Sequence, residues 1–283
     1  MNKIYIILPV HNRRSVTEKF INCLAAQSYQ NYHLILVDDG STDGTAAMAR
    51  AKIKNLTVIR GDGNLWWAGA LHKGYSWLKN NGAAAGDAVL LCNDDVVFDV
   101  GYLQTGMDLL SRTQEAMVLS SIYTLEDKFH EAGVIADLKN LSFKSANIGE
   151  KINCATTRGL FFTFGTFLKI GGFHPVLLPH YLSDFEFTIR AFNRGIKILA
   201  DEKLRLQIDL CTTGYYNSID NEGIAVFFKK FFSKKYPDNP IYKVIFIFMV
   251  CSFPWNLINT FRVSWTAFKH IFFHIRKLFK IKR

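Results

Sequence analysis

Acidic and turn-forming side chains follow three apolar runs in the first hundred residues of this chain. The runs lead into His11, Asp38-Asp39 and Asn93-Asp94-Asp95. Carboxylates suit two kinds of chemistry, because they hold hard divalent cations and take up protons as general bases. A fourth segment, Leu182–Arg190 (LSDFEFTIR), adds two acids. Buried parallel strands deliver such polar ends to one edge of a sheet, where ligands bind, so the pattern predicts the active site of an enzyme.

Strands and helices that alternate along the chain must position these acids. We expect strands at Lys3–Leu8, His33–Val37, Leu56–Ile59 and Ala88–Cys92. Helices are expected from Ser15, which has the spacing of a capping box with Glu18, and at Asp43–Lys52, Trp67–Lys79 and Asp184–Asn193. This βαβα order predicts an α/β fold with a mostly parallel sheet and helices on both faces. Beyond Gly101 the pattern becomes mixed, with apolar stretches at 117–123, 159–168 and 196–199.

The composition permits one large globular domain and an appendage, since 49% of the 283 residues are hydrophobic. The five cysteines show neither paired spacing nor a metal-binding cluster, which is typical of buried thiols in a reducing compartment. The apolar run Ile4–Leu8 is too short for an export signal. We therefore expect the first strand to be internal and the main body to be cytosolic.

The net charge of +10 comes from the end of the chain. Residues 227–283 contain twelve Lys or Arg and one acid, Asp238, so this tail carries about +11 and the preceding residues about −1. After Pro254 a row of large apolar side chains recurs at three- and four-residue steps: Ile258, Phe261, Trp265, Phe268, Phe272, Ile275 and Phe279. This spacing predicts a basic amphipathic helix.

Such a helix is suited to the interface of an anionic membrane, where apolar burial and charge attraction add together. Two alternatives stay open: a helical hairpin that packs on the catalytic domain, and a transmembrane span at Val244–Phe261, which contains several polar residues. Nucleic-acid binding is not expected, because the aromatic residues follow a helical stripe rather than the strand-borne arrangement of common single-strand binders.

The sequence resembles the family 2 glycosyltransferases of GT-A fold, which invert configuration at the anomeric carbon. The similarity covers roughly Lys3–Gly214, and VDDGSTDGT at Val37–Thr45 is its most specific part. Supporting segments are LPVHNR, NLWWAGALHKG at 64–74, Asn-Asp-Asp at 93–95, Gly-Gly-Phe at 171–173 and LSDFEFTIR. The Trp-Trp pair and the long basic tail look most like enzymes that extend bacterial O-antigen or capsule chains on a lipid carrier.

The resemblance implies a GT-A (Rossmann-like) catalytic domain at 1–224, with a nucleotide-sugar half at about 1–100 and an acceptor half at about 101–224. A basic, aromatic-rich helical membrane tail at 225–283 completes the expected organisation. Pro9 and His11 end the first strand and Asp38-Asp39 the second, so the two loops can hold a nucleobase between them. The resemblance implies that Asp39 accepts a hydrogen bond from the base. The structural alternative is an Asx turn that caps the next helix.

A metal is expected at Asn93-Asp94-Asp95. A diphosphate leaving group gains negative charge, which Mg²⁺ or Mn²⁺ held by a carboxylate can neutralise. In the family pattern the last acid of this triplet, Asp95, is the metal ligand. Asn93 stands where relatives often have Asp, and its amide can still form a hydrogen bond with a ribose hydroxyl. Asp94 is expected to contact the nucleotide sugar. A second metal ligand near Asp209, where many relatives have His, is left open. The structural alternative for Asn93-Asp94-Asp95 is a simple polar turn at the end of a strand.

Asp184 is the expected general base, because it falls in the first turn of a helix, whose dipole would keep it ionised. The family motif here is Glu-Asp, and this chain has Ser183-Asp184, so only the second acid is kept. Ser183 and Glu186 have the spacing of a capping box, which would explain both without catalysis. Glu186 is therefore expected to cap the helix, with a contact to the acceptor as a further role.

The segment at 64–74 is expected to contact the sugar. Trp66 and Trp67 can stack on sugar C–H faces, Trp66 toward the acceptor and Trp67 toward the donor, or they can be core aromatics. By position, the resemblance places Asn64 in the donor site and His72 at the diphosphate.

Together these observations predict an enzyme that transfers a sugar from a nucleoside-diphosphate sugar to a glycan hydroxyl, with a polyprenyl-diphosphate-linked glycan as acceptor at the cytoplasmic face of the inner membrane. The rivals are a nucleotidyltransferase, disfavoured because the loop after the first strand lacks glycine, and a non-catalytic membrane adaptor with a decayed site.

Overall fold

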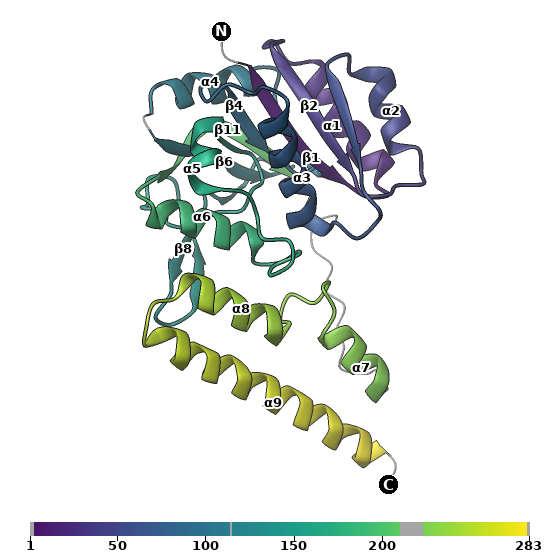
Figure 1. Cartoon of the computed structure of the whole chain (residues 1–283), viewed down its shortest axis with the longest axis vertical. Helices are drawn as coiled ribbons and strands as arrows, with labels where there is room; N and C mark the ends of the chain where they lie inside the picture. Colours follow the sequence, from purple (N-terminus) through teal and green to yellow (C-terminus); the bar gives the residue numbers. More distant parts are fainter. Residues whose placement is uncertain (1–2, 114, 210–222, 282–283) are drawn as a thin grey trace.

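A computed structural model describes residues 3–113, 115–209 and 223–281 (Figure 1). One sheet organises the body, with strands in the order β3-β2-β1-β4-β10-β6-β11-β5 and β7 paired to β6. Its first four strands run parallel: β1 (Ile4–Val10), β2 (Tyr32–Asp38), β3 (Leu56–Arg60) and β4 (Ala88–Leu91). The predicted strands at this side of the sheet are confirmed, with shifts of at most two residues at their ends.

The second half of the sheet is mixed, as the sequence indicates. Strand β10 (Leu160–Thr163) runs antiparallel between β4 and β6 (Ala116–Thr124), while β11 (Lys197–Ile208) is parallel to β6. The short β5 (Val96–Val97) pairs antiparallel with the end of β11. Smaller strands complete the body: β7 (Phe129–Glu131) and the hairpin of β8 (Val134–Asp137) and β9 (Ser142–Ser145).

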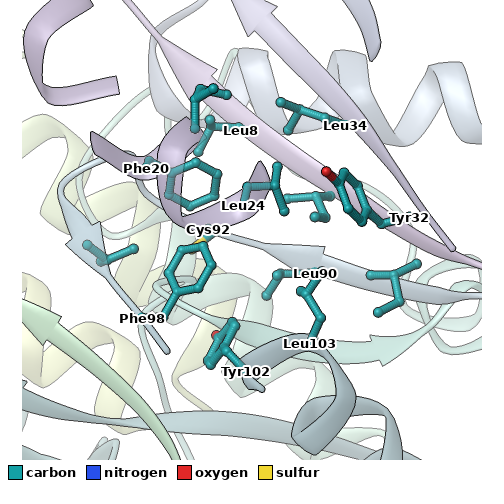
Figure 2. Packing of buried hydrophobic residues seen from close by; sticks show 14 of the residues in the cluster. Leu8, Phe20, Leu24, Tyr32, Leu34, Leu90, Cys92, Phe98, Tyr102 and Leu103 are labelled. Carbon is teal, nitrogen blue, oxygen red and sulfur yellow. The ribbon is translucent and has the colours of Figure 1, made fainter. Parts of the chain in front are cut away.

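Helices cover both faces of the sheet, because successive residues of its buried strands point to opposite sides. Ile6 belongs to a core with α1 (Arg14–Ala25), α2 (Thr45–Lys52) and α4 (Tyr102–Ser111). Figure 2 shows part of this core, in which Phe20, Leu24 and Phe98 surround strand residues such as Leu8 and Leu90. Ile7 belongs to the opposite core, with α3 (Trp66–Asn80), α5 (Phe164–Ile170) and α6 (Ser183–Asn193).

The predicted cap at Ser15 is wrong. Helix α1 begins at Arg14, its N-cap is Arg13, and the Arg13 side chain forms no capping hydrogen bond. Instead, the Arg14 backbone N–H donates to Asp43 Oδ2 at 2.8 Å. Asp43, on a neighbouring loop, caps the helix instead, because the helix begins one residue earlier than the spacing of Ser15 and Glu18 indicates.

The tail is helical, as predicted, with α7 (Ile224–Phe231), α8 (Pro240–Val250) and α9 (Trp255–Ile281). Helix α8 packs on the body through Phe246, Ile247 and Val250, which join a cluster with Val134 and Ile189. Helix α9 runs along the outer side of α8 (Figure 1). Among the helices of the described residues, none has the length and the hydropathy that crossing a bilayer requires.

The cysteines do not pair in the part of the chain that the structure describes. Cys92, Cys154 and Cys251 are buried and Cys23 is half-buried, all as free thiols, while Cys211 lies outside the described residues. Burial raises the pKa of Cys92 and Cys154 far above the usual thiol range. These thiols are therefore protonated and chemically quiet at neutral pH.

Candidate active site

The carboxyl ends of β1, β2 and β4 lie side by side because β1 is the parallel neighbour of both others. The loop after β1 is bound directly to the loop after β2. His11 Nδ1 lies 2.6 Å from the Asp39 carbonyl oxygen, the Asn12 N–H donates to Ser41 Oγ at 2.9 Å, and the Thr42 N–H donates to Asn12 Oδ1 at 2.8 Å. His11 itself is exposed and Pro9 is buried within β1.

Asp38 forms the local turn that was the structural alternative for it. Its Oδ1 accepts from the Ser41 N–H at 2.8 Å, which is an Asx turn, and its side chain is buried. Helix α2 itself begins later, at Thr45. The nucleotide contact expected of Asp38 stays a prediction that nothing in its surroundings favours.

Asp39 organises the next loop. Its Oδ1 accepts from the Gly63 N–H at 2.8 Å, and its Oδ2 accepts from the N–H groups of Leu65 and Trp66 at 2.9 and 3.1 Å. A Cβ at Gly61 would lie 2.4 Å from Asp39 Oδ1, so only glycine permits this approach. A carboxylate offers about four lone-pair positions, so the predicted bond from the nucleobase has one position left.

Asp94 and Asp95 face two arginines. Arg13 reaches Asp94 Oδ1 with Nη1 at 3.4 Å and Asp95 Oδ2 with Nη2 at 3.6 Å, and Arg158 Nε lies 4.0 Å from Asp95 Oδ1. Thr17 Oγ1 donates to Asp94 Oδ2 at 2.7 Å. Burial raises the pKa of Asp94 to about 6, against the opposing pull of Arg13 and Thr17. The two acids and two arginines thus form one compact group of opposite charges.

The residues present fit a divalent cation at Asp95. Its Oδ1 is buried without a hydrogen-bond partner among the described residues. Ile208 pairs with Val96, so Asp209 and Asp95 are the next residues on the two antiparallel strands, and Asp209 is a candidate second oxygen donor at the position left open by the sequence. The described residues contain no group of three His, Cys, Asp or Glu side chains placed to hold a metal. Mg²⁺ is usually bound by one or two carboxylates plus substrate phosphates, and this donor set matches that pattern.

Asp184 lies in the first turn of α6, held by three donors. Trp67 Nε1 donates to Asp184 Oδ1 at 2.7 Å, and the Thr157 backbone N–H donates to Asp184 Oδ2 at 3.3 Å. The Thr157 hydroxyl is the third donor to this carboxylate, and it also accepts from Trp67 Nε1 at 3.2 Å. Desolvation raises the pKa of Asp184, while these bonds and Arg158 oppose the rise. Burial is the largest influence on this pKa, and the expected effect of the helix dipole stays a prediction. A higher pKa makes the carboxylate a stronger proton acceptor.

The capping box expected at Ser183 and Glu186 is absent. The N-cap of α6 is Leu182, with no side-chain cap, and Ser183 Oγ donates to the His180 carbonyl oxygen at 2.6 Å. Glu186 is buried and accepts from Arg190 Nε and Nη2 at 2.7 and 3.0 Å. The cap is replaced because the chain enters α6 through a left-handed residue, Leu182, which turns both side chains away from the first backbone N–H groups. The contact with the acceptor that was expected of Glu186 stays a prediction, and the buried ion pair with Arg190 disfavours it.

The two tryptophans differ in their surroundings. Trp66 has a left-handed backbone (φ 57°), which a bulky residue adopts only under strong constraint, and here the Asp39 carboxylate holds its N–H. Trp67 packs partly on the core while its indole N–H serves Asp184. Trp67 is thus a partly buried core aromatic that also touches the predicted base, and the sugar contacts expected of both tryptophans stay predictions.

Two residues of the same segment lie elsewhere. Asn64 is exposed, and its backbone N–H donates to Asp62. His72 lies two turns into α3 against Gly172 and Tyr75, and burial lowers its pKa. The structure does not bring His72 together with Asp95, so its predicted diphosphate contact is unsupported by its position.

The acids far apart in the sequence converge through shared neighbours. Asp39 holds the backbone of Trp66, the adjacent Trp67 binds Asp184, and Arg158 is within electrostatic range of both Asp184 and Asp95. Residue patterns did not indicate Arg13, Thr157 or Arg158. Arg13 stands inside the LPVHNR segment and could have been noticed there, but Arg158 and Thr157 follow no apolar run and carry no local signal.

Comparisons with known proteins identify the family and the fold. The model of the family described as Glycosyl transferase family 2 matches residues 5–167. Glycosyltransferase AglE of Haloferax volcanii is 25% identical over 208 residues, which cover 69% of this chain and 63% of AglE. The PGL/p-HBAD biosynthesis glycosyltransferase of Mycobacterium bovis is 26% identical over 197 residues, covering 66% and 69% of the two chains. The chain therefore spans less than two thirds of the length of AglE.

Two solved structures share the architecture. The mannosyltransferase PcManGT from Pyrobaculum calidifontis, in complex with GDP-Man and Mn²⁺, has a TM-score of 0.57 at 16% identity and covers 94% of this chain and 74% of its own. GalNAc-T7 with UDP, GalNAc and Mn²⁺ has a TM-score of 0.63 at 12% identity, covering 86% and 48%. At these identities they show the fold alone, and it is the predicted GT-A fold with a C-terminal helical extension. With more than half of its length matched by the family model, the chain belongs to glycosyl transferase family 2.

Proposed function

We propose that this chain is an inverting glycosyltransferase that moves a sugar from a nucleoside-diphosphate sugar to a hydroxyl of an acceptor glycan. One observation carries the proposal: Asp184 is held by Trp67 and Thr157, and Arg158, the residue after Thr157, also faces Asp95. Asp184, which can take a proton, thus lies near Arg158, which can hold a leaving phosphate.

The chemistry follows from this placement. The acceptor oxygen attacks the anomeric carbon and gives its proton to the Asp184 carboxylate, while the bond from that carbon to the diphosphate oxygen breaks and its electron pair leaves with the diphosphate. Arg13 and Arg158 contribute fixed positive charge where this negative charge develops. A divalent cation, Mg²⁺ or Mn²⁺, held by Asp95 and Asp209 would supply further charge neutralisation.

For the donor, we place the nucleotide at the linked loops after β1 and β2, near His11 and Asp39, with Asn93 toward the ribose. PcManGT is in complex with GDP-Man and Mn²⁺, and GalNAc-T7 with UDP, GalNAc and Mn²⁺, which supports a nucleotide-sugar donor and a cation here. Residues 1–100 then form the donor half and residues 101–224 the acceptor half.

For the acceptor, we propose a polyprenyl-diphosphate-linked glycan of bacterial surface polysaccharide synthesis, reached from the cytoplasmic face of the inner membrane. The tail supports peripheral attachment. The face of α9 that packs on the protein carries Asn259, Val263, Ala267 and His274, whereas Phe261, Trp265, Phe268 and Phe272 lie on another face and are 51–71% exposed. A wide apolar stripe on a segment with about +11 charge suits an anionic bilayer.

The experiment is a panel of sugar nucleotides with Mn²⁺, scored first by protection against thermal unfolding and then by transfer or hydrolysis. A donor at a hundredfold excess over its dissociation constant should stabilise the fold by about 2.7 kcal/mol. Asp184→Asn should keep this protection and lower turnover by about 10²–10⁴-fold, the typical contribution of a general base.

Three outcomes would count against the proposal. Full turnover by Asp184→Asn removes the base assignment. Protection without transfer or hydrolysis by any donor favours a binding adaptor, and release of pyrophosphate from a nucleoside triphosphate favours a nucleotidyltransferase.

Addition of a chelator to the active reaction tests the cation, since turnover should fall and return with excess Mn²⁺.

A further inference from the structure

Four side chains outside the carboxylate site meet where the tail touches the body: Trp66, His180, Lys234 and Lys235, here called the Trp66 cluster. The connection between α7 and α8 rises toward the start of α3 (Figure 1). Lys234 and Lys235 lie on this connection, and their Nζ atoms are 5.7 and 5.9 Å from the centroid of the Trp66 ring. The His180 ring lies 5.6 Å from the Trp66 ring.

Two polar atoms of the Trp66 cluster are unsatisfied. Trp66 Nε1 and His180 Nδ1 are both buried without a hydrogen-bond partner among the described residues. An unpaired buried polar group costs about 1–3 kcal/mol, so such atoms are rare unless a ligand completes them. An indole N–H is only a donor, so the missing partner of Trp66 is an acceptor.

The charge of the Trp66 cluster is also uncompensated. Two ammonium groups converge on one ring, and within the described chain neither forms an ion pair with a carboxylate. Burial and, to a smaller extent, the charge of Lys235 together lower the pKa of His180 to about 4, so this imidazole is neutral at pH 7. Two ammonium groups beside one ring, together with its unpaired N–H donor, are suited to an oxyanion with more than one negative charge.

The Trp66 cluster is fixed beside the proposed base. Trp66 is followed by Trp67, which donates to Asp184, and the Ser183 hydroxyl binds the His180 carbonyl oxygen at the start of the same helix. The donor-side charges, Arg158 and Asp95, lie across Asp184 in this chain of contacts. An anion at the Trp66 cluster is therefore separated from the donor diphosphate by the catalytic carboxylate.

We propose that the Trp66 cluster binds the phosphate or diphosphate group of the acceptor, so that Lys234 and Lys235 of the tail and Trp66 of the catalytic body together fix an anionic acceptor with its hydroxyl toward Asp184. This inference rests on the proposed function and adds to it a recognition site for the charged part of the acceptor. It also gives the tail a second task, since the lysines reach the site only when α7 and α8 are in place.

The same phosphate chemistry is present in two other sources, the bilayer headgroups and the donor diphosphate. The experiment uses the full chain and inorganic pyrophosphate as the probe, with affinity measured by calorimetry. Lys234→Gln/Lys235→Gln should raise the dissociation constant at least about tenfold, because one charge-assisted hydrogen bond is typically this strong. Lys229→Gln/Lys269→Gln is the matched control, since both lysines are exposed on the tail and it removes the same charge.

A second readout reports the site itself. The indole N–H signal of Trp66, identified in ¹⁵N-Trp spectra by its loss in Trp66→Phe, should move downfield with pyrophosphate in the wild type and stay in place in Lys234→Gln/Lys235→Gln. Arg158→Gln removes charge on the donor side and should leave this movement intact. Sugar-nucleotide protection should be unchanged in the lysine variant, so loss of donor binding tests the proposed function separately.

Three results would overturn the inference. The first is pyrophosphate affinity that is equal in wild type and Lys234→Gln/Lys235→Gln, or lowered equally by the control pair. The second is loss of the Trp66 signal change in Arg158→Gln alone, which would assign the probe to the donor side. The third is a defect of the lysine pair seen only in sedimentation with vesicles of phosphatidylglycerol and phosphatidylcholine, which would assign the lysines to the bilayer.

Discussion

At the scale of single residues, aspartate side chains have different roles in different surroundings. Asp38 closes a turn through the Ser41 N–H, Asp39 holds a loop through three N–H groups, and Asp94 pairs with Thr17 and Arg13. Burial raises the pKa of both Asp94 and Asp184, but Asp94 also pairs with an arginine, whereas the Asp184 carboxylate lies between an indole and a backbone N–H. Surroundings, rather than residue type, select the proton acceptor.

The pH profile of catalysis tests this selection. A general base must be ionised, so turnover falls as pH drops through its pKa, and desolvation places that acid limb above the ordinary range of an Asp. Trp67→Phe removes a hydrogen bond that lowers the pKa of Asp184, so the acid limb of kcat should move to still higher pH. Trp77→Phe, on the same helix but stacked on His33, is the control and should leave the limb in place. An unmoved limb in Trp67→Phe would mean that another group limits the rate.

At the scale of elements, α6 is positioned by a buried ion pair rather than by a cap. Arg190 binds Glu186 and also donates to the carbonyl oxygens of Ile170 and Gly172, at 2.6 and 3.0 Å, which satisfies the C-terminal end of α5. The helix that carries Asp184 is thereby tied to its neighbour. Spacing alone suggested a cap because Ser183 and Glu186 fit one, but the side chains turn elsewhere.

Removing one partner of this pair should destabilise the fold strongly. Glu186→Ala leaves Arg190 uncompensated in a mostly buried place, and we expect the free energy of unfolding to fall by about 3–5 kcal/mol in urea titrations. Glu115→Ala breaks the exposed pair with Lys169 and should cost at most about 1 kcal/mol. Equal losses in the two variants would contradict a structural role for Glu186.

At the scale of the whole molecule, the tail is both packed and exposed. Helix α8 packs beside α6, as in the helical-hairpin alternative for the tail, while α9 lies on the outer side of α8 (Figure 1) and its aromatic stripe is exposed. Trp265, Phe268 and Phe272 stack on one another with ring centroids 5.7 and 6.2 Å apart, and Arg276 lies 5.5 Å from the Phe272 ring. The two interpretations of the tail therefore apply to different helices.

Replacing the four stripe residues Phe261, Trp265, Phe268 and Phe272 with Gln should abolish sedimentation with anionic vesicles. Each aromatic side chain that leaves the bilayer forfeits about 1 kcal/mol or more, so together they lower the partition coefficient by at least about a hundredfold. The melting temperature should change little because these side chains are exposed. Val176→Gln/Leu177→Gln removes exposed apolar surface from the body and is the control. Sedimentation that survives the stripe variant would show that the stripe does not anchor the chain.

Much of the architecture was readable from local patterns. The apolar runs ending at Leu8, Val37 and Cys92 predicted parallel strands because a buried strand must be apolar on both faces, and the three- and four-residue spacing after Pro254 predicted α9. Helix caps were less readable. The starts of α1 and α6 depend on hydrogen bonds to other segments, which no spacing of nearby residues records.

The sequence by itself determined which acids stand at the strand ends, that the basic charge belongs to the tail, and that one face of its last helix is apolar. Only the tertiary structure decided that Arg158 lies near Asp95 and acts electrostatically on Asp184, that Trp67 donates to Asp184, and that two tail lysines lie over Trp66. The physical reason is that periodicity reports the environment of a residue along its own element, whereas a site depends on which elements meet, and that is fixed by packing between segments distant in the chain.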